Sequence, residues 1–177
     1  ASLQPQIYNG TAVITDNGKP ALDTSAGQQL FYNNYAVSTS NTYTFQVVSN
    51  ITAGDNAFTL FSDTTNTVRI PRAQASSNTN YLYGFTENNF YKNGSTVTLT
   101  TRLSALNTYV DGQLLFGFIG SPDSNYTMQG VFAVDTVDTT FDTEGKHQEI
   151  VIWPTDQDTA GNLDSIESDI MTYFSIT

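Results

Sequence analysis

The stretch FYKNGSTVTLTT, residues 90–101, indicates the fold class. Asn93 and Gly94 tolerate the positive φ that a tight hairpin turn requires. After the turn, Val97 and Leu99 alternate with threonines, which is the period-two pattern of a strand with one buried face. Threonine suits a strand through its β-branch, and its hydroxyl keeps the outer face wet without charge. The stretch therefore predicts an antiparallel hairpin with an uncharged polar surface.

Further β-branched or aromatic runs predict a strand-dominated chain. They are AVIT (12–15), TYTFQVVS (42–49), AFTLFS (57–62), TVTLTTRL (96–103), QLLFGFI (113–119), QGVFAVD (129–135), QEIVIW (148–153) and MTYFSI (171–176). In the second run Tyr43, Phe45 and Val47 alternate with residues expected to face water. Turn pairs stand at Asn9-Gly10, Asn17-Gly18, Asn93-Gly94 and Asp111-Gly112. We predict an all-β fold, a single antiparallel β-sandwich or jelly-roll-like domain spanning residues 1–177.

Only one segment has helical spacing. In DSIESDIM, residues 164–171, Ile166 and Ile170 lie four positions apart, which predicts a helix of one or two turns. The polar stretch QASSNTN, residues 74–80, predicts an exposed loop.

Composition limits the possible partners. Seventeen acidic residues against six Lys and Arg give a net charge of -11, which repels a phosphate backbone and excludes nucleic acid as a partner. No apolar run approaches the roughly 18 residues of a membrane span, so membrane insertion is not expected. The cysteine count is zero, which removes disulfides and thiolate chemistry.

Catalytic signatures are missing from the sequence. His147 is the only histidine; we interpret it as a surface residue of a turn, with a Ser-His-Asp arrangement as the alternative. Asp135, Asp138, Asp142 and Glu144 could supply paired carboxylates for a glycosidase, but a solvated acidic loop explains them more simply. No catalytic residue is assigned, and we expect a protein that is not an enzyme.

One loop resembles a calcium-binding loop. In DQDTAGNLDSIE, residues 156–167, the acids Asp156, Asp158, Asp164 and Glu167 match the spacing of that motif. Ala160 stands where an oxygen ligand belongs, and a strand precedes the loop where the motif requires a helix. An ordinary acidic loop is the preferred interpretation, so no metal or cofactor is assigned.

Other residues could contact a ligand without forming a motif. Arg69 and Arg72 could bind an acidic ligand such as sialic acid, or could balance neighbouring acids. Aromatic rings that could serve recognition or strand packing are Tyr32, Tyr35, Tyr81 and Tyr83. Four glycosylation sequons stand at Asn9, Asn50, Asn93 and Asn125. The sequence therefore leaves the ligand-binding residues unassigned.

The C-terminal segment EIVIWPTDQDTAGNLDSIESDIMTYFSIT, residues 149–177, resembles the end of adenovirus-type fibre heads. The shared features are a Trp-containing strand, a polar loop, an Ile-rich turn and a terminal aromatic strand. The stretch at residues 90–107 is similar to an internal strand pair of such heads. The resemblance implies a homotrimeric β-sandwich at the tip of a fibre that binds a host-cell receptor through its loops.

From the sequence we expect a virion-surface attachment domain, the C-terminal head or protruding part of a longer protein, located on the virion exterior or outside the cell. Its partner would be a host-cell receptor, either glycan or protein. The first alternative is a secreted carbohydrate-binding module or lectin, and the second is a hydrolase that uses the acids of residues 135–144.

Overall fold

The structure is a computed structural model that describes residues 6–7, 12–24, 30–52, 57–63, 65, 67–110, 112–131 and 143–177. All strand pairs in these parts are antiparallel. The larger sheet runs in the order β11 (Ser95–Val97), β10 (Phe85–Lys92), β12 (Gln113–Pro122), β5 (Tyr43–Ile51), β14 (Gly145–Trp153), β3 (Lys19–Asp23), β2 (Ala12–Asp16). The predicted all-β class is therefore confirmed.

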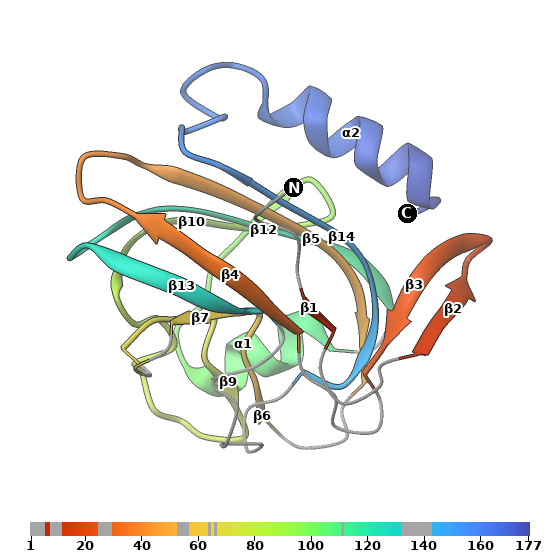
Figure 1. The fold of residues 1–177 in the computed structure, drawn as a ribbon, viewed down its shortest axis with the longest axis horizontal. Coiled ribbons are helices and arrows are strands. Elements are labelled where there is room, and N and C mark those ends of the chain that lie inside the picture. The colour runs from red at the N-terminus through yellow and green to blue at the C-terminus, as the bar shows by residue number, and fades with distance from the viewer. Residues whose placement is uncertain are drawn as a thin grey trace.

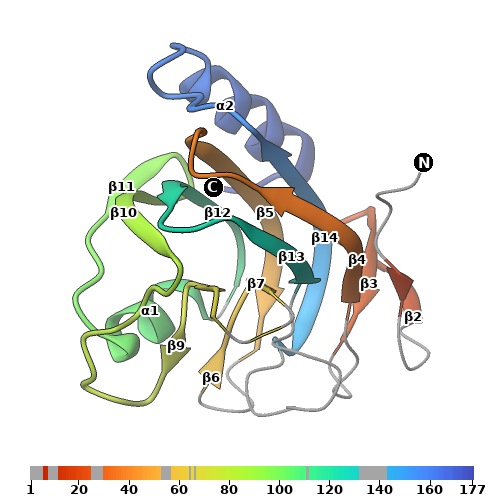
Figure 2. The ribbon, with the colours of Figure 1, turned by 60° about the vertical axis from the view of Figure 1, so that its left-hand side comes forward.

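A second sheet packs against the first. Its order is β1 (Gln6–Ile7), β4 (Leu30–Val37), β13 (Tyr126–Val131), β7 (Phe61–Asp63), β8 (Arg69–Ile70), and β6 (Ala57–Phe58) pairs separately with β9 (Ala73–Gln74). The two larger sheets form the layers of a sandwich (Figures 1 and 2). The described residues also form two helices, α1 (Arg102–Tyr109) and α2 (Leu163–Phe174).

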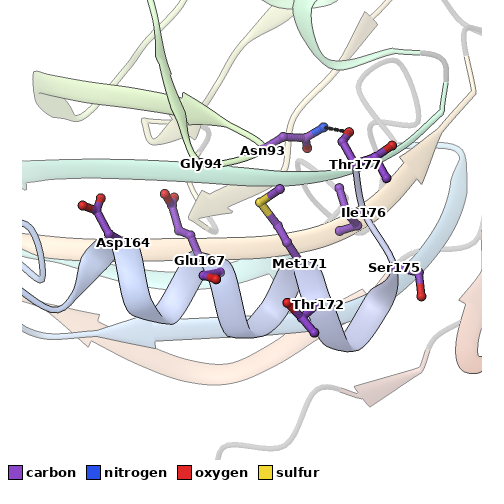
Figure 3. Close-up of a pocket in the computed structure, with 10 residues that line it drawn as sticks. Asn93, Gly94, Asp164, Glu167, Met171, Thr172, Ser175, Ile176 and Thr177 are labelled. Atoms are coloured by element: carbon purple, nitrogen blue, oxygen red, sulfur yellow. Dashed lines mark hydrogen bonds between the residues drawn. The ribbon is translucent and has the colours of Figure 1, made fainter.

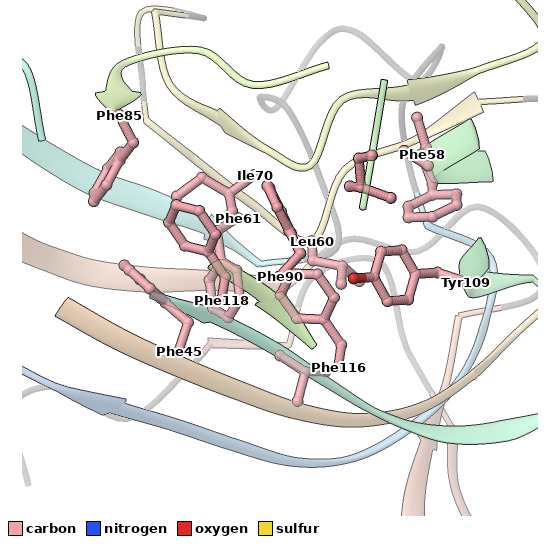
Figure 4. Close-up of a cluster of buried hydrophobic side chains, with 14 of the residues drawn as sticks. Phe45, Phe58, Leu60, Phe61, Ile70, Phe85, Phe90, Tyr109, Phe116 and Phe118 are labelled. Carbon is pink, nitrogen blue, oxygen red and sulfur yellow. The ribbon is translucent and has the colours of Figure 1, made fainter. Parts of the chain in front are cut away.

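Aromatic rings fill the space between the layers (Figure 4). Phe45 on β5 lies with its ring centroid 4.9 Å from that of Phe61 on β7, which joins the two sheets. Within the larger sheet, the rings of Phe90 and Phe118 lie 4.8 Å apart. Each of these four side chains is at most 1% exposed. Such tilted aromatic pairs bury large apolar areas, so this cluster supplies much of the driving force for folding.

Two of the predicted turns form as expected. Asn17 and Gly18 have φ of 48° and 72° between β2 and β3, and Asn93 and Gly94 have φ of 49° and 74° between β10 and β11. Asp111-Gly112 was expected to close a hairpin, but Gly112 instead lies on the connection from α1 to β12. Asn9-Gly10 lies outside the described residues. The loop after Gln74 is largely exposed, which confirms the prediction for residues 74–80.

The strand expected at residues 96–103 ends at Val97, and α1 begins at Arg102. Thr101 caps this helix: its hydroxyl accepts a hydrogen bond from the backbone N–H of Ser104, and the Ser104 hydroxyl accepts one from the backbone N–H of Thr101. This is a capping box with Ser in the place usually held by Glu or Gln. These two bonds give a partner to two backbone N–H groups that the helix itself leaves unbonded. A helix therefore starts where the threonine pattern predicted a strand.

The strand expected at residues 171–176 is also wrong, because α2 continues to Phe174 and ends at Ser175 with φ of 56°. Its inner face carries Leu163, Ile170 and Phe174 at helical spacing. These side chains pack on outward-facing residues of the larger sheet, including Val48 and Leu115. The helix thus covers the outer face of the sheet, opposite the smaller sheet (Figure 1).

This cover changes the burial of β5. Thr44, Gln46 and Val48 were expected to face water, yet each is at most 1% exposed. The Thr44 hydroxyl donates to the carbonyl O of Thr155 at 3.0 Å and accepts from the backbone N–H of Gln157 at 3.0 Å. Strand β5 is therefore buried on both faces, and its polar side chains bond to the chain that leads into α2.

Candidate functional site

Helix α2 creates a hollow on each of its two sides. The first, of about 450 Å³, lies between α2 and the β10–β11 turn (Figure 3) and is lined by Asn93, Gly94, Asp164, Glu167, Ser168, Met171, Thr172, Ser175, Ile176 and Thr177. The second, of about 410 Å³, lies between α2 and β14 and is lined by Glu149, Val151, Trp153, Ile166, Asp169, Ile170, Tyr173 and Phe174. We call them the turn pocket and the α2–β14 groove.

The turn pocket is closed at one end by hydrogen bonds that hold its walls together. The Asn93 side chain donates from Nδ2 to the carbonyl O of Thr177 at 3.2 Å, and its Oδ1 accepts from the backbone N–H of Leu115 at 2.9 Å. Both ends of this amide are thus committed to the fold. Asn93 is the asparagine of a predicted sequon, and its role here is to tie the C-terminus to the hairpin.

Glu167 lies at the base of the turn pocket and is 2% exposed. Its Oε1 accepts a hydrogen bond of 2.9 Å from Nε2 of Gln46 on β5. Gly117 makes room for this pair, because a Cβ at that position would lie 3.0 Å from both polar atoms. Burial raises the pKa of the Glu167 carboxyl, and the bond from Gln46 opposes part of that rise. This carboxyl belongs to the helix–sheet contact and offers little surface to a ligand.

The α2–β14 groove combines aromatic and acidic side chains. Alternate residues of β14 point to the same face of a sheet, which places Glu149, Val151 and Trp153 together. The facing wall is α2, whose Asp169 is exposed and whose Tyr173 is 58% exposed. The groove therefore presents rings along its length and a carboxylate on each wall.

One face of the Tyr173 ring is occupied within the chain. The Nζ of Lys19, on the β2–β3 hairpin, lies 3.8 Å from the ring centroid, a cation–π contact. Asn17 of the same hairpin donates to the carbonyl O of Phe174 at 2.6 Å. The hairpin thus braces the C-terminal end of α2 and fixes the aromatic wall of the groove.

The strand at the base of the groove has an open edge among the described strands. β14 pairs with β5 along its whole length but with β3 only at Lys146 and His147. From Glu149 to Trp153, β5 is the single partner among the described strands. Backbone groups at such an edge are available to an added ligand or chain.

His147 is not the surface residue that the sequence predicted. It is 2% exposed, and its Nε2 lies 2.9 Å from the hydroxyl of Thr24 and 3.2 Å from the carbonyl O of Thr143. Because a carbonyl only accepts, Nε2 carries the proton. Burial lowers the pKa of His147 to about 3, so the ring is neutral at pH 7. Thr24 is 0% exposed as well, so a substrate has no access to this pair.

The two acidic loops are described to different extents. Asp135, Asp138 and Asp142 lie outside the described residues, so the paired-carboxylate hypothesis is not tested; Glu144 is partly buried. The Asp156 carboxylate forms hydrogen bonds within its own loop, where it accepts from the backbone N–H groups of Asp158 and Thr159. In the described part of the chain, no three His, Cys, Asp or Glu side chains gather in a way that could hold a metal ion.

The predicted arginine pair gains a third member. The side chains of Arg72 and of Arg102, at the start of α1, both donate to the Tyr83 hydroxyl, and the backbone of Arg69 pairs with that of Tyr83. Tyr81 packs against the core, and Tyr35 contacts Tyr43 edge-on at 6.3 Å, so both serve packing; the side chain of Tyr32 lies outside those described. Nothing in the sequence spacing indicated Arg102, which stands thirty positions from Arg72.

The sequons fall in different environments. Asn125 is exposed in the turn between β12 and β13, and its Oδ1 accepts from the backbone N–H of Thr39 at 3.0 Å. Asn50 lies on β5 and is partly buried, and Asn9 lies outside the described residues.

No described helix has the length and apolar character needed to cross a membrane.

Comparison with protein-family models, with curated proteins and with solved structures finds no match to this chain.

Proposed function

We propose that this chain is a non-enzymatic attachment domain of a virion surface, and that it binds a host-cell receptor in the α2–β14 groove. The observation that supports the proposal is an open groove that sets Trp153 and Tyr173 beside the carboxylates of Glu149 and Asp169 on a rigid β scaffold. Pockets that bind small ligands combine apolar walls with a few well-placed polar groups. The resemblance of residues 149–177 to fibre heads adds less support, because the terminal aromatic strand among its shared features is the end of helix α2 in the structure.

The chemistry of the groove favours a neutral glycan. Ring faces pack on the apolar faces of sugars, and carboxylates accept hydrogen bonds from sugar hydroxyls. An anionic ligand would meet two carboxylates here and a chain of net charge -11. A protein receptor could instead use the open edge of β14, and the same experiment would reveal it.

The test is binding of the intact chain to an array of neutral and acidic glycans and to susceptible cells, followed by titration of the best ligand. Tyr173→Ala should weaken binding by about tenfold or more, equivalent to ~1.4 kcal/mol, and Asp169→Asn by a few-fold. Leu103→Ala removes another exposed apolar side chain, 40% exposed on α1 and far from the groove (Figure 1), and should leave binding unchanged. Equal binding by all three variants would contradict the groove as the receptor site.

The same groove supports a second candidate, a secreted carbohydrate-binding module. An aromatic wall with carboxylates is what such a module would use, and no feature of the groove separates the two functions. The separation lies in assembly, because a fibre head acts as a homotrimer whereas a module acts alone. The oligomeric state in solution therefore distinguishes the two functions.

A further inference from the structure

Two of the three arginine side chains of the chain, Arg72 and Arg102, meet at Tyr83, and the backbone of the third, Arg69, pairs with the same residue. The backbones of Arg69 and Tyr83 exchange hydrogen bonds of 3.2 Å. The guanidinium carbon of Arg72 lies 5.2 Å from the centroid of the Tyr83 ring, and its Nη1 donates to the Tyr83 hydroxyl at 2.9 Å. Arg102 reaches the same hydroxyl from Nη2 at 3.3 Å. Two guanidinium groups from distant segments therefore meet at one hydroxyl.

The Tyr83 hydroxyl receives more donors than it can accept. Besides the two guanidinium groups, Nδ2 of Asn80 also donates to it. A phenol oxygen has two acceptor positions, and here three N–H donors converge on it. The hydroxyl oxygen therefore has one donor more than it can accept. An oxygen with greater negative charge would bind these three donors more strongly.

Arg102 is a buried cation surrounded by neutral oxygens. It is 6% exposed, and its hydrogen bonds run to the carbonyl O of Asn80, to Oδ1 of Asn80, to Oε1 of Gln74 and to the Tyr83 hydroxyl. Lys146 and Asp16 form the salt bridge seen among the described residues, and Arg102 is not part of one. Burying a charge without an opposite charge costs free energy, which an arriving anion would offset.

We propose that the donors of Arg72, Arg102 and Asn80, which meet at the Tyr83 hydroxyl, form a binding site for an oxyanion, a carboxylate or a sulfate group. Asn80 is exposed, and Arg72 and Tyr83 are partly buried, so this cluster borders on solvent. Guanidinium groups bind carboxylate and sulfate through paired N–H···O bonds, which gives the site its ligand class. The site is separate from the α2–β14 groove and does not depend on the function proposed for it.

The test is titration of the intact chain by calorimetry and by thermal unfolding, with sodium sulfate and sodium acetate at constant ionic strength set by chloride. Saturable binding and a rise in Tm are expected for the wild-type chain. Arg72→Gln should weaken the binding by about tenfold or more. Lys19→Gln makes the same charge change beside the α2–β14 groove and should leave anion binding within twofold of the wild-type value.

A second variant separates binding from structure. Tyr83→Phe removes the hydroxyl and frees the donors, so sulfate should bind at least as tightly as to the wild-type chain even if Tm falls in buffer. Loss of all anion binding in Tyr83→Phe, no saturable binding to the wild-type chain, or equal weakening in Arg72→Gln and Lys19→Gln would each overturn the proposal.

A third titration distinguishes an acidic glycan from a small free anion as the ligand. A methyl glycoside that carries a carboxylate is compared with acetate and with the corresponding neutral glycoside. Binding of the acidic glycoside at least about tenfold tighter than acetate supports the site and assigns it to an acidic glycan. Equal affinity for glycoside and acetate also supports the site, with a small free anion as the ligand.

Discussion

A single buried imidazole shows how much one residue can depend on its surroundings. His147 stands in a polar stretch of sequence, yet β14 places it beside Thr24 and Thr143 with 2% exposure. Desolvation disfavours its cation and lowers its pKa, and the nearby charge of Asp23 opposes only part of that effect. The ring therefore acts as a neutral donor inside the sheet.

The pH dependence of stability should reveal this residue. Its folded pKa of about 3 lies below the ordinary value of 6.5, so the unfolded chain takes up the proton first. The stability linked to His147 is complete above pH 6.5 and is lost as the pH falls toward 3, by at most about 1.4 kcal/mol per pH unit. His147→Gln cannot titrate, so urea unfolding between pH 7 and pH 4 should show a smaller loss in the variant. Identical slopes would contradict a buried neutral ring.

At the scale of the element, α2 is held by an apolar face with one acid in it. Leu163, Ile170 and Phe174 pack on the outer face of the larger sheet, and Glu167 lies among them over Gly117. Burial raises the pKa of Glu167, and the charges of Asp164 and Asp158 add to the rise. The helix is thus docked most favourably when this carboxyl is protonated.

Removing the charge should strengthen the docking. Because the folded pKa of Glu167 is raised above its ordinary value of 4.5, the stability linked to it is complete below pH 4.5 and is lost as the pH rises through the folded pKa. Glu167→Gln should therefore have a higher Tm than the wild-type chain at pH 7 and a similar Tm at pH 4.

Asp169→Asn is the matched control, since it makes the same acid-to-amide change on the exposed side of α2. Its Tm should differ little from that of the wild-type chain at either pH. A Glu167→Gln variant that is destabilised at pH 7 would show that the ionised carboxylate is needed for the helix–sheet contact.

At the scale of the whole molecule, two sites of opposite charge lie on one β scaffold. The α2–β14 groove is acidic and aromatic, whereas the site around Tyr83 collects the arginines. The chain as a whole carries a net charge of -11, which comes from its excess of Asp and Glu over Lys and Arg. A strongly acidic surface keeps a protein soluble and limits contacts with anionic surfaces.

The proposed attachment role predicts a homotrimer in solution. Light scattering should give a mass of about 58 kDa, three copies of the 19.4 kDa chain, both with and without a calcium chelator. Chelation should have no effect because Asp156 already accepts the backbone N–H groups of its own loop. A 19.4 kDa species would favour the carbohydrate-binding module instead, and dissociation on chelation would assign a structural ion to the loop.

The sequence by itself determined the features that depend on neighbouring residues. Asn17-Gly18 and Asn93-Gly94 form their hairpin turns because positive φ is a local property of these residues. Leu99 is buried while Thr98 and Thr100 are exposed, because successive side chains of an extended chain alternate. The all-β class follows from many such local signals.

Only the tertiary structure decided which faces were covered. An apolar run such as residues 171–176 suits a strand or a helix, and the outer face of the sheet selected the helix by offering Val48 and Leu115 for burial. That helix in turn buried Gln46 and built both hollows. The gathering of the arginines at Tyr83 likewise depends on long-range strand pairing. Burial and convergence are properties of contacts between distant segments, and a local pattern carries no information about them.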